Sequence, residues 1–328
     1  MSKLVTIYGG SGFVGRYIAQ RMAREGWRVR VAVRRPNDAI FVRPYGTPGQ
    51  VEPVLCNIRD EASVRAAMAG ADAVVNCVGI LVPEGKNRFD SVQAEGAARI
   101  ARIAAETGVG QMVHISAIGA DPASNSLYSR TKGVGEDAVR AAFPTAAILR
   151  PSVIFGPEDQ FFNRFASMAR FAPALGVVGG RTKFQPVYVD DVAAAAAACI
   201  LKGQSGTFDL GGPEVMSFAD LMRLMLRVIS RPKPVVSIPF PVAQVMGGAF
   251  DLLQDLTGGF FVNRVVTLDQ IKNLRRDNVV AAGARGFADL GLTPTAMEVM
   301  LPEYLWRFRP GGQYEAIKAS ARNMRKEP

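Results

Sequence analysis

Short runs rich in β-branched residues alternate with amphipathic stretches along the first half of the chain. The runs predict strands at Leu4–Tyr8, Arg28–Val33, Val51–Leu55, Ala73–Asn76, Gln111–Ile115 and 146–149. The stretches between them predict helices at residues 13–25, 62–68, 89–107 and 128–143. Strands that alternate with helices form βαβ units, in which helices cover both faces of a parallel sheet. Because such crossovers are right-handed, the pattern predicts a doubly wound α/β sheet.

The pattern changes after Pro151. Helices are predicted at residues 161–171, 192–202 and 218–229, and the last of these has its apolar residues on one face. We therefore expect a first domain at 1–150 and a smaller C-terminal α/β lobe at 151–308, with segments that return to the main sheet. Residues 309–328 hold five basic and two acidic side chains, which predicts an exposed basic tail.

Composition narrows the possible chemistry. The 328 residues are 48% hydrophobic and 21% charged, which is typical of a globular protein. Three widely separated cysteines and the single histidine, His114, predict no metal site. The net charge of +10 divides into +6 for residues 1–150 and +4 for the remainder. This even excess favours anionic partners, such as a phosphorylated cofactor, a membrane surface or an acidic protein. No nucleic-acid-binding motif is present, so we expect no nucleic-acid partner.

The longest uncharged stretch, residues 234–250, is 17 residues long and contains Pro239 and Pro241. A spanning helix needs about 20 mostly apolar residues, so we expect no transmembrane segment. The first strand follows Lys3 directly, and we expect neither a signal peptide nor a presequence. The apolar stretch 234–256 leaves two interpretations open: ordinary core, or a patch covered by another protein or by lipid headgroups.

A glycine-rich loop connects the first predicted strand to the first predicted helix. Gly9, Gly12 and Gly15 follow a G-x-x-G-x-x-G spacing, with Phe13 and Val14 at the start of the helix. Such glycines permit a tight turn, close approach of a pyrophosphate, and tight helix–strand packing. The helix N-terminus then offers free N–H groups to the phosphates. The loop therefore predicts a dinucleotide-binding (Rossmann) domain, and the alternative is a tight turn without a ligand.

The residues after the second strand indicate which dinucleotide is bound. An NAD site usually has an acidic residue there, whereas this chain has Arg34 and Arg35. Guanidinium groups pair with a 2′-phosphate, which favours NADP(H); the alternative is a solvated basic turn. Asn57 and Ile58 after the third strand are expected to border the adenine. The expected ribose contacts after the fourth strand are Cys77, Val78 and Gly79.

A Y-x-x-x-K pair, Tyr128 and Lys132, lies on a predicted helix twelve residues after Ser116, which ends the fifth strand. Residues four apart share a helix face. A lysine and a cationic nicotinamide would stabilise the phenolate, so that the tyrosine could act as an acid or base. If the protein is an enzyme, these three residues are its predicted catalytic set.

The order of these motifs resembles that of the short-chain dehydrogenase/reductase superfamily. Its extended branch, which includes sugar-nucleotide epimerases, carries a C-terminal substrate lobe after a motif similar to residues 150–157. The resemblance implies that Ser116, Tyr128 and Lys132 contact the nicotinamide half of the cofactor. It adds Pro151 and Ile154 to the expected contacts.

A closer resemblance is to the nucleotide-binding accessory subunits of respiratory complex I. It rests on residues 8–15, on 150–158 with 161–168, and on 185–192, and it extends over most of the chain. It implies a structural NADPH with no catalytic residue, and a C-terminal lobe docked near the quinone-site end of the peripheral arm. The expected location is an anionic membrane surface, either the cytoplasmic face of a bacterial inner membrane or the matrix side in mitochondria.

Two other functions stay open at the level of sequence. One is an NADPH-dependent reductase or sugar-nucleotide epimerase that uses Tyr128, Lys132 and Ser116. The other is a soluble sensor of the NADP(H) redox state that binds a regulator.

Replacement of both Arg34 and Arg35 by alanine should weaken binding of NADP(H) at least about tenfold more than binding of NAD(H). Only NADP(H) carries the 2′-phosphate, and hydrogen bonds between charged groups are the strong ones. Titration of both cofactors against the wild-type and variant proteins measures this ratio. Equal loss of the two cofactors would contradict the 2′-phosphate assignment.

Overall fold

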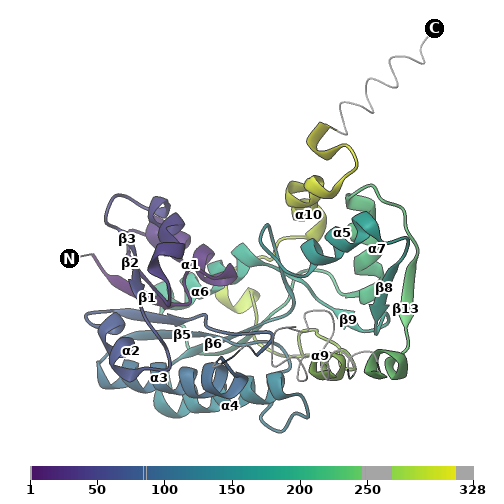
Figure 1. Ribbon diagram of the computed structural model, residues 1–328. Coiled ribbons are helices and arrows are strands. Elements are labelled where there is room, and N and C mark those ends of the chain that lie inside the picture. The colour runs from purple at the N-terminus through teal and green to yellow at the C-terminus, as the bar shows by residue number, and fades with distance from the viewer. Residues whose placement is uncertain (1, 84, 86, 246–247, 249–267, 315–328) are drawn as a thin grey trace.

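A parallel sheet forms the centre of the molecule, as the strand pattern predicted (Figure 1). The computed structural model describes residues 2–83, 85, 87–245, 248 and 268–314. Seven strands follow the order β11-β6-β5-β4-β1-β2-β3, and every neighbouring pair is parallel. Their bounds are β1 Leu4–Tyr8, β2 Arg28–Val33, β3 Val51–Leu55, β4 Ala73–Asn76, β5 Gln111–Ile115, β6 Ala147–Pro151 and β11 Gly206–Leu210. The order reverses at β1, so the sheet is doubly wound.

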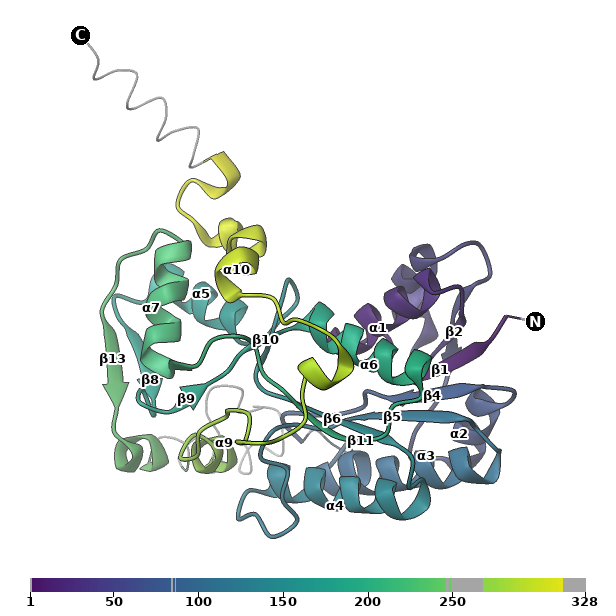
Figure 2. The ribbon, with the colours of Figure 1, turned by 180° about the vertical axis from the view of Figure 1, so that it is seen from behind.

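Helices cover both faces of this sheet (Figures 1 and 2). One face carries α1 Phe13–Arg24 and α6 Val189–Lys202; the other carries α2 Glu61–Met68, α3 Glu95–Glu106 and α4 Leu127–Ala142. The alanine run of α6 is buried, and these small side chains let α6 lie close against α1.

Three local features differ from the predictions. Helix α6 begins at Val189 rather than at residue 192, because the acidic side chains of its first turn are held: Asp190 by Arg21 and Asp191 by Thr295. The helix predicted from residue 89 starts with a π-helical segment, Asp90–Ala94, before α3. A 3-10 segment at Pro36–Tyr45, which the sequence pattern did not predict, separates β2 from β3.

The C-terminal lobe has a core of its own, rich in phenylalanine. It contains α5 Phe162–Phe171, β8 Leu175–Val178, β9 Lys183–Phe184, β12 Met216–Ser217, α7 Phe218–Val228, β13 Val235–Ile238 and α10 Met297–Leu305. Phe161 stacks on Phe218 with ring centroids 5.6 Å apart, and Phe184 lies 5.4 Å from Phe218. Two short strands, β7 Ile154–Phe155 and β10 Val187–Tyr188, pair beside this core. The division of the chain into domains at residue 150 stays a prediction. From the later part of the chain, β11 returns to the main sheet and pairs with β6.

The remaining described elements are short. They are α9 Leu268–Asn273 and the 3-10 segments Ala288–Leu290, Trp306–Phe308 and Gly312–Tyr314. In the part of the chain that the structure describes, no helix combines the length and apolarity needed to cross a bilayer. The same residues contain no cluster of three or more His, Cys, Asp or Glu suited to a metal ion.

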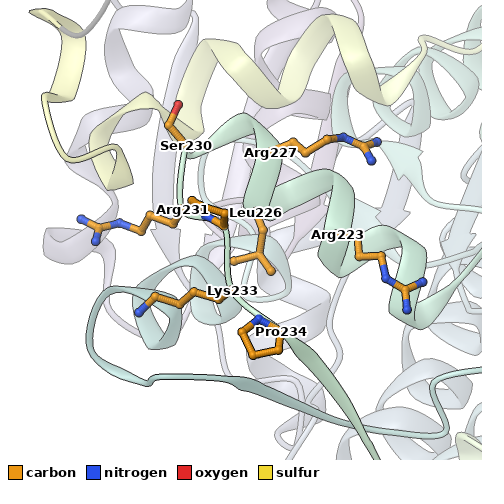
Figure 3. Close-up of a pocket in the computed structure, with 8 residues that line it drawn as sticks. Arg223, Leu226, Arg227, Ser230, Arg231, Lys233 and Pro234 are labelled. Atoms are coloured by element: carbon orange, nitrogen blue, oxygen red, sulfur yellow. The ribbon is translucent and has the colours of Figure 1, made fainter.

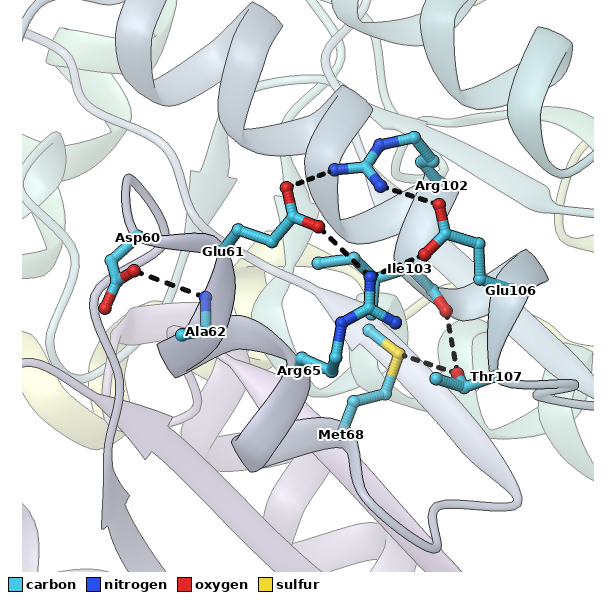
Figure 4. Close-up of polar contacts among 9 residues, drawn as sticks. All are labelled: Asp60, Glu61, Ala62, Arg65, Met68, Arg102, Ile103, Glu106 and Thr107. Atoms are coloured by element: carbon cyan, nitrogen blue, oxygen red, sulfur yellow. Dashed lines mark hydrogen bonds and ion pairs between the residues drawn. The ribbon is translucent and has the colours of Figure 1, made fainter.

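A surface network of ion pairs joins α2 to α3 (Figure 4). Arg102 donates to Glu61 and to Glu106, each at 2.6 Å, and Arg65 pairs with the same two carboxylates. All four side chains are more than 40% exposed, so water screens the pairs and they align the helices more than they stabilise them.

A second network is buried. The Glu136 carboxylate on α4 is fully inaccessible and accepts from Arg150 at 2.6 and 2.8 Å and from Arg140 at 2.7 Å. This carboxylate raises the pKa of the Arg150 guanidinium. The network ties α4 to the end of β6.

Glu136→Gln should lower the free energy of unfolding by about 3 kcal/mol, because it leaves two guanidinium groups without their buried partner. Asp137→Asn is the matched control, since Asp137 also pairs with Arg140 but is 60% exposed. Its cost should stay below about 1 kcal/mol. Chemical unfolding of both variants measures the difference, and equal costs would contradict the buried-network interpretation.

Candidate functional site

The glycine loop between β1 and α1 has the geometry of a phosphate-binding turn. Gly9 has a φ of +75°, which side chains disfavour. A Cβ on Gly15 would lie 2.7 Å from the Gly10 Cα, so only glycine fits there. Helix α1 begins at Phe13 with Gly12 as its N-cap, with no side-chain cap and no acidic residue in its first turn. The N-terminus is therefore suited to an anion.

The predicted contacts after β2, β3 and β4 lie at the same edge of the sheet as this loop, because parallel strands end there together. Arg34 and Arg35 are exposed, and among the described residues Arg35 makes a long 3.8 Å pair with Asp38. Ile58 packs against Gly96, and its carbonyl accepts from Arg99 at 2.7 Å. The Asn57 side chain accepts from the Arg59 amide at 3.2 Å.

The loop after β4 is held by a chain of hydrogen bonds that starts in the core. Asn76 Oδ1 accepts from the Val78 amide at 3.0 Å, and its Nδ2 lies 3.1 Å from His114 Nδ1. Burial, assisted by Lys132, lowers the pKa of His114 to about 3. The neutral ring accepts at Nδ1 and carries its proton at Nε2. Among the described residues this buried Nε2 has no partner.

Cys77 and Val78 lie against the glycine loop. A Cβ on Gly9 would meet Val78 Cγ2 at 3.2 Å and the Cys77 carbonyl carbon at 3.3 Å. Burial raises the pKa of Cys77 to about 12, so the thiol is neutral. Val14, Cys77 and Ile154 all pack at the margin of the same apolar core. The Pro151 carbonyl accepts from the Ile118 amide at 3.0 Å.

Lys132 is buried beside β5. Its Nζ donates to the Ile115 carbonyl at 3.0 Å and would lie 3.5 Å from a Cβ on Gly79. Burial lowers the pKa of the ammonium to about 8, and Glu136 and Cys77 partly oppose this shift. Lys132 thus brings a cation close to the loop after β4.

Tyr128 and Ser116 complete the predicted set. The Tyr128 ring meets Phe89 edge to face at 6.0 Å, and burial raises the pKa of its phenol to about 12. From the sequence, we expected Lys132 and a cationic nicotinamide to stabilise the phenolate of Tyr128. In the protein alone, burial disfavours the phenolate, and the Lys132 ammonium donates its hydrogen bond to the Ile115 carbonyl. Ser116 is 4% exposed, and its Oγ has no partner among the described residues.

These residues fit a dinucleotide. The glycine cradle suits a pyrophosphate, and the two arginines suit a further phosphate. The unpartnered Ser116 hydroxyl and the buried Lys132 offer a donor and a charge to the other end of such a ligand. The assignment of each residue to the cofactor stays a prediction.

Comparison with known proteins gives the family. Residues 5–211 match the model of the NAD dependent epimerase/dehydratase family. The chain is 35% identical to the mitochondrial NADH dehydrogenase (ubiquinone) 1 alpha subcomplex subunit 9 of Arabidopsis thaliana, over 94% of this chain and 79% of that protein. It is 28% identical to the NADH-ubiquinone oxidoreductase 40 kDa subunit of Neurospora crassa, over 98% and 84%. The chain belongs to the NAD dependent epimerase/dehydratase family, together with the subunit 9 proteins.

Some proteins that are similar to the chain are enzymes by name. A ceramide reductase of Caulobacter vibrioides is 29% identical over 77% of this chain and 79% of its own length. A UDP-glucose 4-epimerase of Thermotoga maritima superposes with a TM-score of 0.71 at 16% identity, over 93% of this chain and 98% of that one. The latter likeness shows the fold alone. Family membership confirms the resemblance and indicates a nicotinamide dinucleotide, without choosing between NAD and NADP.

Sequence reasoning missed several residues around this site. Asp269, Asn273 and Asn278 lie more than 120 residues from the side chains they contact on α4 and after β6. No local pattern in the sequence marks them.

Lys132→Met should remove a rise of stability between about pH 8 and 10.5. In that window the folded lysine is neutral while the unfolded lysine, with its ordinary pKa of 10.5, still binds a proton. The free energy of unfolding of the wild type should therefore increase relative to the variant, by on the order of 3 kcal/mol across the window.

Lys202→Met is the matched control, because Lys202 also donates to a backbone carbonyl, that of Leu290 at 2.9 Å, but is exposed. Its stability curve should run parallel to that of the wild type. Parallel curves for Lys132→Met as well would contradict the buried-charge interpretation.

Proposed function

We propose that this protein is an accessory subunit of respiratory NADH:ubiquinone oxidoreductase (complex I) that holds NADPH as a structural cofactor. The observation that carries the proposal is the similarity to subunit 9, at 35% identity over nearly the whole chain and 79% of that protein. The similarity is not confined to the dinucleotide half, as it would be if only a shared cofactor were responsible.

The choice of NADPH rests on the end of β2. Arg34 and Arg35 occupy the position where an NAD site would place a carboxylate. Their exposed guanidinium groups are available to a 2′-phosphate. Bound NADPH would stabilise the fold by mass action, by about 2.7 kcal/mol at a free concentration 100 times its Kd.

The docking surface that we propose is the basic face of the C-terminal lobe. Residues 160–189 and 217–245 contain eight lysines and arginines but a single acidic residue, Asp220. These segments form α5, β8, β9, α7 and β13, which lie together in one lobe (Figure 1). The even split of charge between the two halves of the sequence thus conceals a net +7 on these two segments. The adjoining α10 and the turn after it are balanced, with two acidic and two basic side chains.

A cavity of about 470 Å³ lies on this face between α7 and the segment that leads to β13. Figure 3 shows Arg223, Arg227, Arg231 and Lys233 around a floor formed by Leu226 and Pro234. Apolar side chains lie in the same lobe, and Phe171 at the end of α5 is 80% exposed. A cationic rim with exposed apolar groups suits an anionic membrane surface beside the peripheral arm. We place the protein there, near the quinone-site end of the arm, on the cytoplasmic side in bacteria or the matrix side in mitochondria.

The apolar stretch 234–256, a candidate interface from the sequence, lies only partly within the described residues. Within this stretch, Ala243 is buried while Val242 and Val245 are exposed, so its described part is neither wholly core nor wholly exposed. Residues 246–247 and 249–256 lie outside the described residues.

The proposal is tested by extracting native membranes with mild detergent, separating the extract by size and locating this chain by mass spectrometry. Co-migration with NADH:ubiquinone oxidoreductase activity is expected. Recovery only as a small free species would contradict the subunit assignment.

Arg223→Gln with Arg227→Gln should reduce co-migration and membrane binding severalfold at physiological salt, because about 1 kcal/mol of attraction is lost per cation. Arg231 and Lys233 are left unchanged, since they donate to the carbonyls of Phe308 and Ala172. The charge-matched control is Arg24→Gln with Arg28→Gln, two exposed positions on the opposite half of the molecule. Equal effects of the two pairs would contradict a specific docking face.

A second candidate is an NADPH-dependent reductase. It is favoured by the presence of Ser116, Tyr128 and Lys132 and by the similarity to a ceramide reductase. NADPH oxidation that depends on an added carbonyl substrate, and that is lost in Tyr128→Phe, would establish this alternative. The accessory-subunit proposal expects no such turnover.

A further inference from the structure

A strap formed by residues 268–280 runs from the C-terminal lobe to the dinucleotide half of the molecule. It begins with α9, which lies between the lobe and the start of α4 in both views (Figures 1 and 2). Ile271 is 1% exposed and packs with Val178 and Ala243 of the lobe. Further along, the Lys183 amide donates to Asp277 at 2.8 Å. The strap is therefore part of the lobe by its packing.

Its polar side chains, in contrast, bind the first turn of α4. Asp269 Oδ1 accepts from the Leu127 amide at 2.7 Å. Asp269 Oδ2 accepts from the Tyr128 amide at 3.1 Å and from the Ser126 hydroxyl at 2.9 Å. Ser126 is the N-cap of α4, so one carboxylate satisfies two free amides of the helix start and orients its cap.

A second contact reinforces the first. The Ser129 hydroxyl donates to Asn273 Oδ1 at 3.0 Å, one turn further along α9. The strap thus contacts Ser126, Leu127, Tyr128 and Ser129, the turn that carries Tyr128 and precedes Lys132 on the same helix.

The far end of the strap binds the other wall of the site. Asn278 Oδ1 accepts from the Ser152 hydroxyl at 2.6 Å and from the Val153 amide at 3.1 Å. These residues lie between Pro151 and Ile154, which are predicted cofactor contacts. One strap therefore joins α4, the turn after β6 and the lobe.

We propose that Asp269 is a positioning residue for the nicotinamide half of the dinucleotide site. By holding the first turn of α4, it sets where the Tyr128 phenol and the Lys132 ammonium meet the cofactor. The inference rests on the proposed function, because it requires that these two side chains contact NADPH. It also makes cofactor binding and docking of the strap mutually dependent, since any coupling between two sites is reciprocal.

Two ligands separate this role from general stability. NADPH reaches Tyr128 and Lys132, whereas 2′,5′-ADP contains only the half that Arg34 and Arg35 would hold. In the full-length chain, Asp269→Asn should weaken NADPH binding about tenfold, the effect of losing about one charge-assisted hydrogen bond. Binding of 2′,5′-ADP should stay within about twofold of the wild type. Calorimetric titration measures both ligands.

The matched control is Asp289→Asn. Asp289 also caps a short turn near the C-terminus, where it accepts from the Gly286 amide at 2.7 Å, but it lies on the α6 side of the sheet. The Asp289→Asn substitution should change neither the affinity for NADPH nor that for 2′,5′-ADP. Asn273→Ala removes only a neutral hydrogen bond and should weaken NADPH binding about threefold. This variant tests the same role if Asp269→Asn does not fold.

Hydrogen exchange provides an independent measurement. NADPH should slow exchange of the Leu127 and Tyr128 amides in the wild type, and this protection should be smaller in Asp269→Asn. Equal weakening of NADPH and 2′,5′-ADP, or no weakening of either, would overturn the positioning role. Failure of the wild-type chain to bind either ligand would instead overturn the proposed cofactor.

Discussion

The close approach of α1 to the end of β1 is the contact on which the rest of the structure depends. It requires glycine at Gly9, which has a positive φ, and at Gly15, where a Cβ would collide with the backbone of the loop; at Gly10 a Cβ would lie a tight 3.0 Å from the Ile7 carbonyl oxygen. The same approach brings the bare N-terminus of α1 to the carboxyl edge of the sheet. It also influences the position of α6, whose buried alanines pack beside α1 on the same face of the sheet. A phosphate-binding turn and a tightly packed face therefore arise from one constraint.

Helix α4 has two roles that impose opposite demands. Glu136 needs its arginine partners because it is fully buried, and this network fastens the helix to β6. One turn earlier, Lys132 is buried without a carboxylate in contact, and burial lowers the pKa of its ammonium to about 8. Glu136 stabilises the helix through its arginine partners. The buried charge of Lys132 lowers the stability of the fold at neutral pH, yet this lysine lies beside the loop that follows β4. This contrast is typical of a residue kept for binding rather than for folding.

The C-terminal lobe connects a charged surface to the dinucleotide half through the strap. Its phenylalanine core holds α5 and α7 together. The strap packs on this lobe through Ile271 and binds α4 through Asp269. A protein that docks through the lobe and holds a cofactor in the other half can thus connect the two events through a few hydrogen bonds.

The sequence by itself determined the sheet and the site's local motifs. Six of the seven strands of the sheet and the glycine loop follow from β-branched runs and from glycine spacing, which depend on neighbours only a few residues away. The Y-x-x-x-K pair was likewise visible because its spacing is that of one helical turn. The contacts between residues far apart in the sequence were decided by the tertiary structure alone. Lys132 bonds the Ile115 carbonyl, Glu136 meets Arg150, and Asp269 caps a helix more than 140 residues earlier in the chain.

The same distinction applies to charge and to proton binding. The net charge of each half appeared even in sequence, although segments 160–189 and 217–245, which lie in one lobe, carry eight basic residues and one acidic residue. The phenol of Tyr128 was expected to be acidified by Lys132 and a bound cationic nicotinamide, while in the protein alone burial raises its pKa to about 12. Burial and hydrogen-bond partners depend on the packing of the whole chain, and no local pattern contains that information.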